Sequence, residues 1–261
     1  MIPEILASLA AATAAGSLAG YGIFGARSRL WGPLVWHGDT SLPARVALTF
    51  DDGPHPDATP RTLDLLAKSG VRATFFVIGA QAEKWPGLLR RIVSEGHLLG
   101  NHSFSHGRWG GFRFTEYWSR EIDRTSRLID EIAGVRPAWF RPPFGVKQWH
   151  MHRAVRRAGH TMITFTERAL DGLATTPDRI VARLVPSAAA GSILVLHDGS
   201  VSTNDRPVEP TLEALPKIIE GLRARGLAIA PLDELLEAAP YASPVKVEAA
   251  QAPSRARALN S

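Results

Sequence analysis

The stretch Val46-Ala47-Leu48-Thr49-Phe50-Asp51-Asp52-Gly53-Pro54 is an apolar, β-rich run that ends in two acidic residues and a turn. A run of this kind, closed by Gly-Pro, predicts a buried strand that leads into a loop. Two adjacent carboxylates at the end of such a strand repel each other unless a cation or a shared proton offsets their charges. The stretch therefore predicts a core strand with a cation site or a proton-sharing pair at its carboxyl end.

A second polar cluster follows in Asn101-His102-Ser103-Phe104-Ser105-His106, where two histidines stand four residues apart. A carboxylate together with two imidazoles is a common ligand set for a catalytic divalent metal that keeps one position open for water. The acidic pair and this histidine pair together predict a metal-activated hydrolase.

From Val46 onward, short apolar runs alternate with amphipathic stretches, which predicts strands alternating with helices. We expect strands at 45–50, 73–78, 97–100, 138–141, 161–165, 192–197 and 227–231. We expect helices at 59–69, 82–95, 115–133, 147–158, 177–186 and 208–225, with a short one at 232–238. This order predicts one α/β domain, a parallel sheet with its helices outside that is either closed as a barrel or doubly wound.

In both architectures, ligands bind at the carboxyl ends of the strands. Polar residues follow five of the expected strands: Asp51-Asp52, His102 with His106, Arg141-Pro142-Pro143-Phe144-Gly145, Asp171, and His197-Asp198-Gly199. Each group alone has a structural explanation as a turn, a helix face or an ion pair. Their shared placement at one edge of the sheet predicts a functional site.

Composition excludes several classes of protein. The 261 residues are 45% hydrophobic and 21% charged, as in an ordinary globular protein, and the absence of cysteine excludes disulfides and thiolate metal sites. The formal net charge is +5, but the basic residues are dispersed among acidic ones. Because no stripe of basic and aromatic residues is present, we expect no nucleic-acid partner. The charge favours attraction to an acidic polymer or an anionic membrane surface.

The two ends of the chain differ from its middle. No charged residue lies between Glu4 and Arg27, and we expect residues 5–26 to form a membrane anchor, with an amphipathic or buried helix as the alternative. We therefore divide the chain into an apolar N-terminal segment at 1–30, a main domain at 40–240 and a disordered tail at 241–261.

The polar groups also form five motifs, and in these the sequence resembles the polysaccharide deacetylases of the NodB-homology type, carbohydrate esterase family 4. Thr49-Phe50-Asp51-Asp52-Gly53-Pro54 is similar to the first motif, and His102-Ser103-Phe104-Ser105-His106 to the second. Arg141-Pro142-Pro143-Phe144-Gly145 is similar to the third, Asp171 stands at the aspartate of the fourth, and Leu194-Val195-Leu196-His197-Asp198 is similar to the fifth. The resemblance covers roughly residues 45–238 and implies a single distorted (β/α)7 barrel, which here follows an N-terminal apolar helix.

The resemblance implies a role for each matched residue. It implies that Asp52, His102 and His106 bind a divalent metal, most commonly zinc, with cobalt or nickel as substitutes. It further implies that Asp51 is the general base that deprotonates the attacking water, and that Arg141 holds Asp51 in place.

The remaining motifs imply the other half of the reaction. His197 would protonate the leaving amine, Asp171 would tune His197, and the backbone N–H near Phe144 would help to hold the oxyanion. The chain departs from the family where Gly172 replaces a common tryptophan and Phe165 replaces a strand tryptophan. We expect the first change to reshape one wall of the sugar site.

The reaction implied is removal of N-acetyl groups from an N-acetylated glycan such as peptidoglycan, a chitin-like oligosaccharide or an exopolysaccharide. We expect a membrane-associated or cell-envelope location in a bacterium, with the side of the membrane left open. Two alternatives remain: an amidase acting on a non-sugar C–N bond, and a membrane-tethered glycan-binding protein with an inactive site. Trp109, Phe112, Trp118 and Trp149 are expected either to stack on sugar rings or to pack within the protein.

Overall fold

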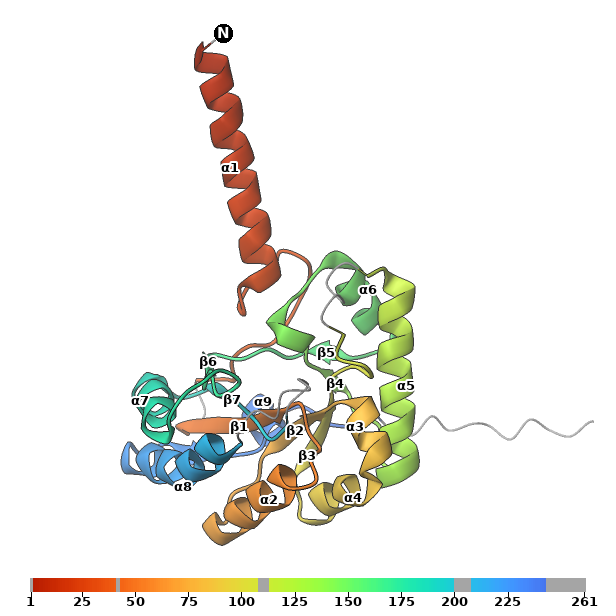
Figure 1. Ribbon diagram of the computed structural model, residues 1–261, viewed down its shortest axis with the longest axis vertical. Coiled ribbons are helices and arrows are strands. Elements are labelled where there is room, and N and C mark those ends of the chain that lie inside the picture. The colour runs from red at the N-terminus through yellow and green to blue at the C-terminus, as the bar shows by residue number, and fades with distance from the viewer. Residues whose placement is uncertain (1, 41–42, 108–112, 200–207, 243–261) are drawn as a thin grey trace, which may run out of the picture.

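A curled parallel sheet forms the centre of the molecule (Figure 1), for which a computed structural model describes residues 2–40, 43–107, 113–199 and 208–242. The strand order is β5-β4-β3-β2-β1-β7-β6, and β8 pairs with the first residues of β1. The strands are β1 (Arg45–Asp51), β2 (Thr74–Val77), β3 (Leu98–Asn101), β4 (Trp139–Phe140), β5 (Thr161–Met162), β6 (Glu167–Arg168), β7 (Ile193–His197) and β8 (Ala228–Ile229). Every pairing among them is parallel, which confirms the distorted (β/α)7 fold.

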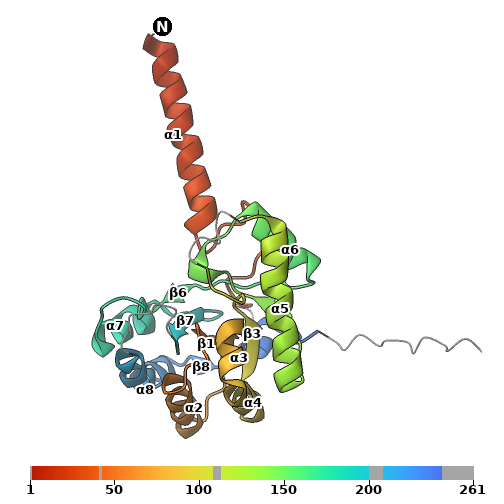
Figure 2. The same cartoon turned by 45° about the vertical axis from the view of Figure 1, so that its right-hand side comes forward.

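Helices surround the sheet (Figures 1 and 2). They are α2 (Ala58–Ser69), α3 (Gly79–Lys84), α4 (Pro86–Ser94), α5 (Thr115–Ala133), the short 3-10 turn η2 (Pro143–Gly145), α6 (Trp149–Arg157), α7 (Pro177–Ser187), α8 (Glu209–Ala224) and α9 (Leu232–Leu236). The single helix expected at 82–95 is instead two helices. Pro86 lacks a backbone N–H and opens α4 at its first turn, so the chain breaks at Trp85.

Strand β1 lies in the middle of the sheet, between β2 and β7. Its residues from Val46 to Asp51 are all buried, because helices or loops cover both faces of a parallel sheet. Phe50 stacks on Phe75 of β2 with ring centroids 5.1 Å apart, within the largest of the apolar core clusters. This packing fixes the carboxyl end of β1, and with it Asp51, at the centre of one edge of the sheet.

The structure corrects the expected strand at 161–165. Strand β5 ends at Met162, and the following residues pair with the N-terminal segment instead. Val35 donates from its backbone N–H to Met162 O at 2.9 Å and accepts from Thr164 N at 2.8 Å. Strand β6 was not expected, because two residues as polar as Glu167 and Arg168 carry no apolar periodicity.

Helix α1 (Ile2–Phe24) projects away from the body of the molecule (Figures 1 and 2). Its end is attached to the body, since the backbone N–H of Lys147 donates to Ile23 O at 3.0 Å. None of the helices formed by the described residues is long and apolar enough to cross a membrane. The membrane anchor at 5–26 stays a prediction.

Most of the expected tail at 241–261 lies outside the described residues, as do Trp109 and Phe112. The first residues of that segment belong to the body: Tyr241 Oη accepts from Leu99 N at 3.1 Å, and Ala242 N donates to Arg136 O at 2.9 Å. The disordered tail predicted for 241–261 therefore does not include its first two residues.

Candidate active site

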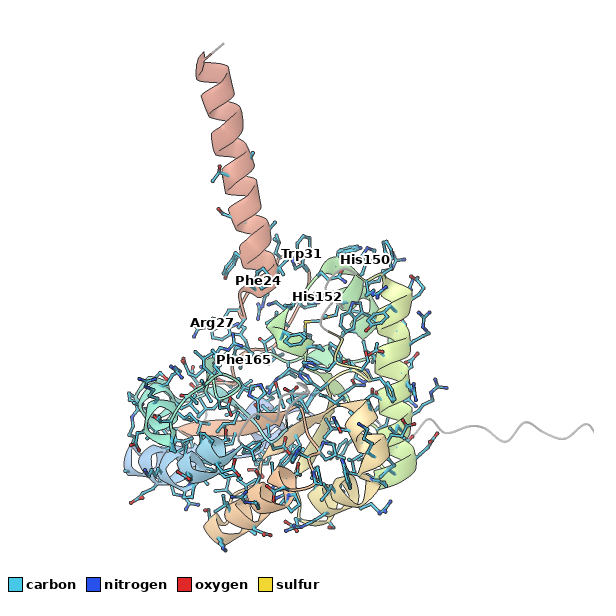
Figure 3. All side chains as sticks on the ribbon, viewed as in Figure 1. Phe24, Arg27, Trp31, His150, His152 and Phe165 are labelled. Carbon is cyan, nitrogen blue, oxygen red and sulfur yellow. The ribbon has the colours of Figure 1, made fainter. Side chains whose placement is uncertain are left out.

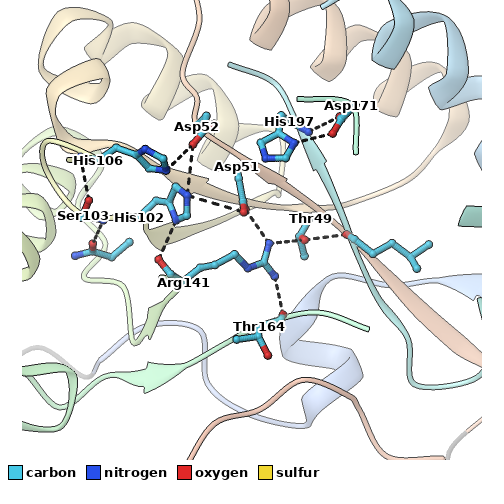
Figure 4. Close-up of polar contacts among 12 residues, drawn as sticks. Thr49, Asp51, Asp52, His102, Ser103, His106, Arg141, Thr164, Asp171 and His197 are labelled. Atoms are coloured by element: carbon cyan, nitrogen blue, oxygen red, sulfur yellow. Dashed lines mark hydrogen bonds and ion pairs between the residues drawn. The ribbon is translucent and has the colours of Figure 1, made fainter. Parts of the chain in front are cut away.

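The adjacent carboxylates of Asp51 and Asp52 have different partners (Figure 4). Asp51 is the last residue of β1, and its Oδ1 lies 2.8 Å from Arg141 Nη1. Asp52 has already left the strand with φ 72, a left-handed conformation that few residues other than glycine adopt. Its Oδ1 lies 3.2 Å from His106 Nε2 and 3.4 Å from His102 Nε2. The backbone thus separates the two acids that the sequence places side by side.

Asp52, His102 and His106 form a three-ligand cluster whose candidate ligand atoms all lie within 4.8 Å of one another. Asp52 Oδ1 is buried and accepts no hydrogen bond from any described residue, which is costly for a carboxylate oxygen. Burial would raise the pKa of Asp52, but the contacts with His102, His106 and His197 lower it, so the carboxylate is ionised at neutral pH. A buried anion without hydrogen bonds, facing two ring nitrogens, fits a bound cation.

The protonation of the two rings supports the same assignment. His102 Nδ1 lies 2.9 Å from the carbonyl oxygen of Arg141, which can only accept, so Nδ1 carries a proton and Nε2 is the nitrogen that faces Asp52. Burial lowers the pKa of His106 to about 4, which makes this ring neutral at pH 7. Two imidazoles and one carboxylate are donors that suit zinc and related divalent metals.

A tight loop after β3 brings the two histidines to the same side. Ser103 and His106 both have left-handed backbones, with φ 65 and φ 48. The side chain of Asn101 accepts from Ser103 N at 2.9 Å, and Ser103 Oγ accepts from His106 N at 3.1 Å. These side-chain bonds satisfy backbone groups that a loop of this shape leaves without partners in the sheet. The hydroxyl between the histidines is therefore a structural part of the ligand loop.

Arg141 lies behind Asp51 and is 1% exposed. Its Nη1 also donates to Thr49 Oγ1 at 2.6 Å, its Nη2 donates to Thr164 O at 3.1 Å, and its guanidinium stacks 4.0 Å above the Phe76 ring. These contacts hold the guanidinium in one orientation. The guanidinium in turn orients the Asp51 carboxylate.

His197 lies at the end of β7, next to the end of β1. Its Nδ1 is 2.7 Å from Asp171 Oδ1, and its backbone N–H donates to Asp171 Oδ2 at 2.8 Å. Burial alone would lower the pKa of His197, but the charge and hydrogen bond of Asp171 raise it to about 10. Since Nδ1 faces Asp171, the proton on Nε2 is the one available for transfer at neutral pH.

Comparison with known proteins now identifies the family. A model of the polysaccharide deacetylase family matches residues 39–163. Over 194 residues the chain is 32% identical to a peptidoglycan-N-acetylglucosamine deacetylase of Bacillus cereus, an overlap of 74% of this chain and 69% of that protein. This chain belongs to the polysaccharide deacetylase family.

Two further matches cover nearly all of the proteins concerned. A chitooligosaccharide deacetylase of Sinorhizobium fredii is 36% identical over 196 residues, which are 72% of this deacetylase and 90% of that protein. The crystal structure of the Bc1960 peptidoglycan N-acetylglucosamine deacetylase, in complex with 4-naphthalen-1-yl-N-oxidanyl-benzamide, superposes with a TM-score of 0.73 at 29% identity. It covers 80% of this chain and 95% of the solved one. The prediction that the protein is a polysaccharide deacetylase is confirmed.

The predicted site residues of this deacetylase converge on one cavity of about 620 Å³. Asp51, Asp52, His102, His106, Phe144, Asp171 and His197 line it, and Arg141 lies behind Asp51. The large apolar residues of its lining are Phe144, Phe165, Leu170, Leu173, Val195 and Val208. Gly172 and Phe165, the two departures from the family pattern, both lie in the lining.

The aromatic residues expected to stack on sugars or to pack inside are now partly assigned. Trp118 is 1% exposed and belongs to a core cluster with Phe140, so it packs inside. Trp149 is 58% exposed but lines a different cavity. Phe144 lies beside the ligand cluster: it is 50% exposed, and its ring centroid lies 4.4 Å from that of His106.

Sequence reasoning missed the hydroxyls that support the site. Thr49 stands two residues before Asp51, so strand alternation places both on the same face, and this signal was available. Thr211 Oγ1 donates to Asp171 Oδ2 at 2.9 Å, but it comes from α8, where no pattern indicates such a contact. The carboxylate of Asp198 was also missed. It is 1% exposed and packs against the Asp52–Gly53 turn so closely that a Cβ at Gly53 would lie 2.5 Å from both of its oxygens.

Proposed function

We propose that this deacetylase removes the N-acetyl group from an N-acetylglucosamine unit of a glycan, either peptidoglycan or a chitooligosaccharide. The observation that carries the proposal is the placement of Asp51 and His197 at neighbouring strand ends, beside a ligand cluster suited to a divalent metal. Relatives named for each of the two substrates support the substrate class. An exopolysaccharide with the same acetamido sugar remains a further candidate.

We propose that Asp52, His102 and His106 hold the metal, and that zinc is the native ion, with cobalt or nickel able to replace it. When bound, such a metal polarises the acetamide carbonyl and lowers the pKa of water to about 7. The mixed imidazole and carboxylate donor set supports these ions over magnesium or calcium, which prefer oxygen ligands alone.

The residues around this cluster would perform the proton transfers. Asp51 accepts a proton from the water whose oxygen attacks the acetamide carbonyl carbon, and Arg141 keeps its carboxylate in position. His197 donates its Nε2 proton to the amide nitrogen as the C–N bond breaks, which releases acetate and the free amine. The Phe144 backbone N–H would stabilise the negative charge on the carbonyl oxygen, an effect typically worth about 3–4 kcal/mol per donor.

Acetate release from the purified protein tests this proposal. We expect release from chitooligosaccharides and from peptidoglycan, loss of release with a chelator, and recovery on addition of zinc. Release from small non-sugar acetamides but not from glycans would favour the amidase alternative. Glycan binding without acetate release at any metal would favour the glycan-binding alternative.

We also propose that residues 5–26 associate with a membrane and hold the catalytic domain at the cell envelope. The support is that these residues carry no charge and form most of α1, which projects from the body (Figure 1). Sedimentation of the full chain with lipid vesicles tests the association, and absence of binding to any vesicle would contradict it.

A further inference from the structure

A second cavity, of about 450 Å³, lies away from the active site at the base of α1. Its lining consists of Trp31, Gly32 and Pro33 from the N-terminal segment, and of Trp149, His152, Arg153, Arg156 and Arg157 from α6. We call this cavity the arginine pocket. None of its lining residues is acidic, and none has a role in the deacetylation proposed above.

The charge of the arginine pocket is not neutralised from within the protein. Arg153 and Arg156 are exposed and pair with no acidic side chain in the described ranges. Arg157 has one carboxylate near it, Glu116 at 3.8 Å, and both side chains are more than half exposed, so this pair contributes little. Three guanidinium groups on one helix face therefore favour an anionic ligand, and guanidinium forks suit phosphate oxygens.

The same pocket includes one buried histidine. His152 is 3% exposed, and its Nε2 forms no hydrogen bond with any described residue. Burial, together with Lys147, lowers the pKa of His152 to about 4, so its ring is neutral at pH 7. Buried polar groups in folded proteins nearly always have a partner, so His152 adds a neutral polar group without one beside the three arginines.

Trp31 of the arginine pocket lies at the end of α1 that meets the body (Figure 3). A Cβ added at Gly22 of α1 would lie 2.9 Å from Trp31 Nε1, so the helix packs directly on a residue of the pocket lining. Five large apolar side chains in this part of the molecule are exposed. They are Leu18, Tyr21 and Phe24 of α1, Leu30 just after α1, and Trp149 at the start of α6. Exposed aromatic and apolar groups beside arginines are typical of surfaces that contact the headgroup region of a membrane.

We propose that the arginine pocket binds the phosphate of an anionic phospholipid headgroup, with Arg153 and Arg156 on the phosphate and Trp149 against the lipid body. The proposal rests on the membrane association of residues 5–26 proposed above. It adds a lipid preference that the uncharged segment 5–26 does not itself supply, because charge attraction to anionic lipids requires basic side chains at the surface.

Vesicle sedimentation of the full chain measures this preference. Wild-type protein should bind vesicles of phosphatidylcholine mixed with phosphatidylglycerol more tightly than vesicles of phosphatidylcholine alone. In Arg153→Gln/Arg156→Gln the affinity for the anionic vesicles should fall by about fivefold for each arginine removed, or about 25-fold together, and the preference over phosphatidylcholine should be lost. The matched control is Arg90→Gln/Arg179→Gln, which removes the same charge from exposed positions on α4 and α7 and should keep the preference.

The outcomes separate the proposals from one another. Wild-type binding to both vesicles with equal affinity would overturn the pocket and leave the membrane association standing, whereas binding to neither would overturn both. Equal losses in the two double variants would assign the preference to net charge and overturn the pocket. Acetate release from a soluble chitooligosaccharide should be the same in all three proteins, so failure of the deacetylase proposal appears separately.

A competition experiment identifies the source of the phosphate. Soluble short-chain phosphatidylglycerol should displace the protein from anionic vesicles at a much lower concentration than inorganic phosphate, since only the lipid offers a body for Trp149 to contact. Displacement by inorganic phosphate at equal or lower concentration would assign the pocket to a free phosphate ester and overturn the lipid assignment.

Discussion

Arg141 Nη1 bridges Asp51 Oδ1, at 2.8 Å, and Thr49 Oγ1, at 2.6 Å, two residues that alternate onto the same face of β1. This bridge holds the Asp51 carboxylate away from the ligand cluster, since Asp51 Oδ2 remains 3.9 Å from His102 Nε2. The neighbouring Asp52 instead faces both histidines. Two adjacent and chemically identical side chains thus have different partners, Arg141 for Asp51 and the two histidines for Asp52.

Substitution of the two aspartates should separate their roles. Asp51→Asn keeps the side-chain shape and should retain metal, but it should lower kcat by roughly 10²–10⁴-fold because the general base is lost. Asp52→Ala should lose the metal itself, because it removes the oxygen that faces both imidazoles. Metal content after gel filtration and kcat on a chitooligosaccharide provide the two measurements, and normal turnover by Asp51→Asn would refute the base assignment.

Thr49→Val should lower kcat without loss of metal. The hydroxyl of Thr49 donates to Leu194 O at 2.8 Å and accepts from Arg141, so valine frees the guanidinium from one of its fixed partners. The matched control is Thr166→Val, which removes a hydroxyl that donates to Ile193 O at 2.9 Å away from Arg141. Each variant should lose about 1 kcal/mol of stability. If kcat falls equally in both, Thr49 has no specific part in positioning Asp51.

Asp171→Asn should shift the alkaline limb of the kcat–pH profile to lower pH. A general acid works only while protonated, and the pKa of about 10 for His197 keeps its ring charged through the neutral and mildly alkaline range. Removal of the Asp171 charge leaves burial as the main influence, and burial lowers the pKa of His197. Thr211→Val is the control, because it removes one hydrogen bond to Asp171 and keeps the charge. An unchanged alkaline limb in Asp171→Asn would contradict the role of His197 as acid.

Asp198→Asn should make the stability of the folded protein less dependent on pH between about 4 and 7. Burial raises the pKa of Asp198 to about 7, whereas the unfolded chain releases this proton near its ordinary value of 3.8. The native state therefore binds more protons between these two values, and stability falls as pH rises through that window, by roughly 4 kcal/mol. Asparagine carries no charge and should remove this loss. Unfolding free energies near the two ends of the window, measured with chelator present, test the prediction, and parallel pH dependence in both proteins would contradict it.

Local sequence signals were enough to predict the core of the site. The apolar run into Asp51, the histidine spacing of four and the strand-ending His197 each depend on a few consecutive residues. A parallel sheet brings the carboxyl ends of its strands to one edge, so residues far apart in the chain could be placed together before any contact was known. This geometric rule is the reason that the predicted site residues gather around one cavity.

Contacts between distant elements carried no comparable signal. Nothing in the short run around Val35 indicates that it pairs with Ile163, and nothing near Thr211 indicates that its hydroxyl reaches Asp171. The break of the helix expected at 82–95 lies between these two cases. Pro86 is a local signal for the start of a helix, but its effect on the residues before it depended on how the chain packs.

The sequence by itself determined the fold class, the strand ends and the residue types of the site, because strand periodicity and turn residues are local properties. The family resemblance already implied that Asp52 joins the histidines and that Arg141 holds Asp51, and the tertiary structure supplied the contacts. Only the tertiary structure decided that arginines of α6 meet Trp31 at the base of α1. Those outcomes depend on the exact direction of each side chain and on packing between segments distant in the chain. The Val46–Pro54 stretch encodes two aspartates, and the surrounding fold makes them different.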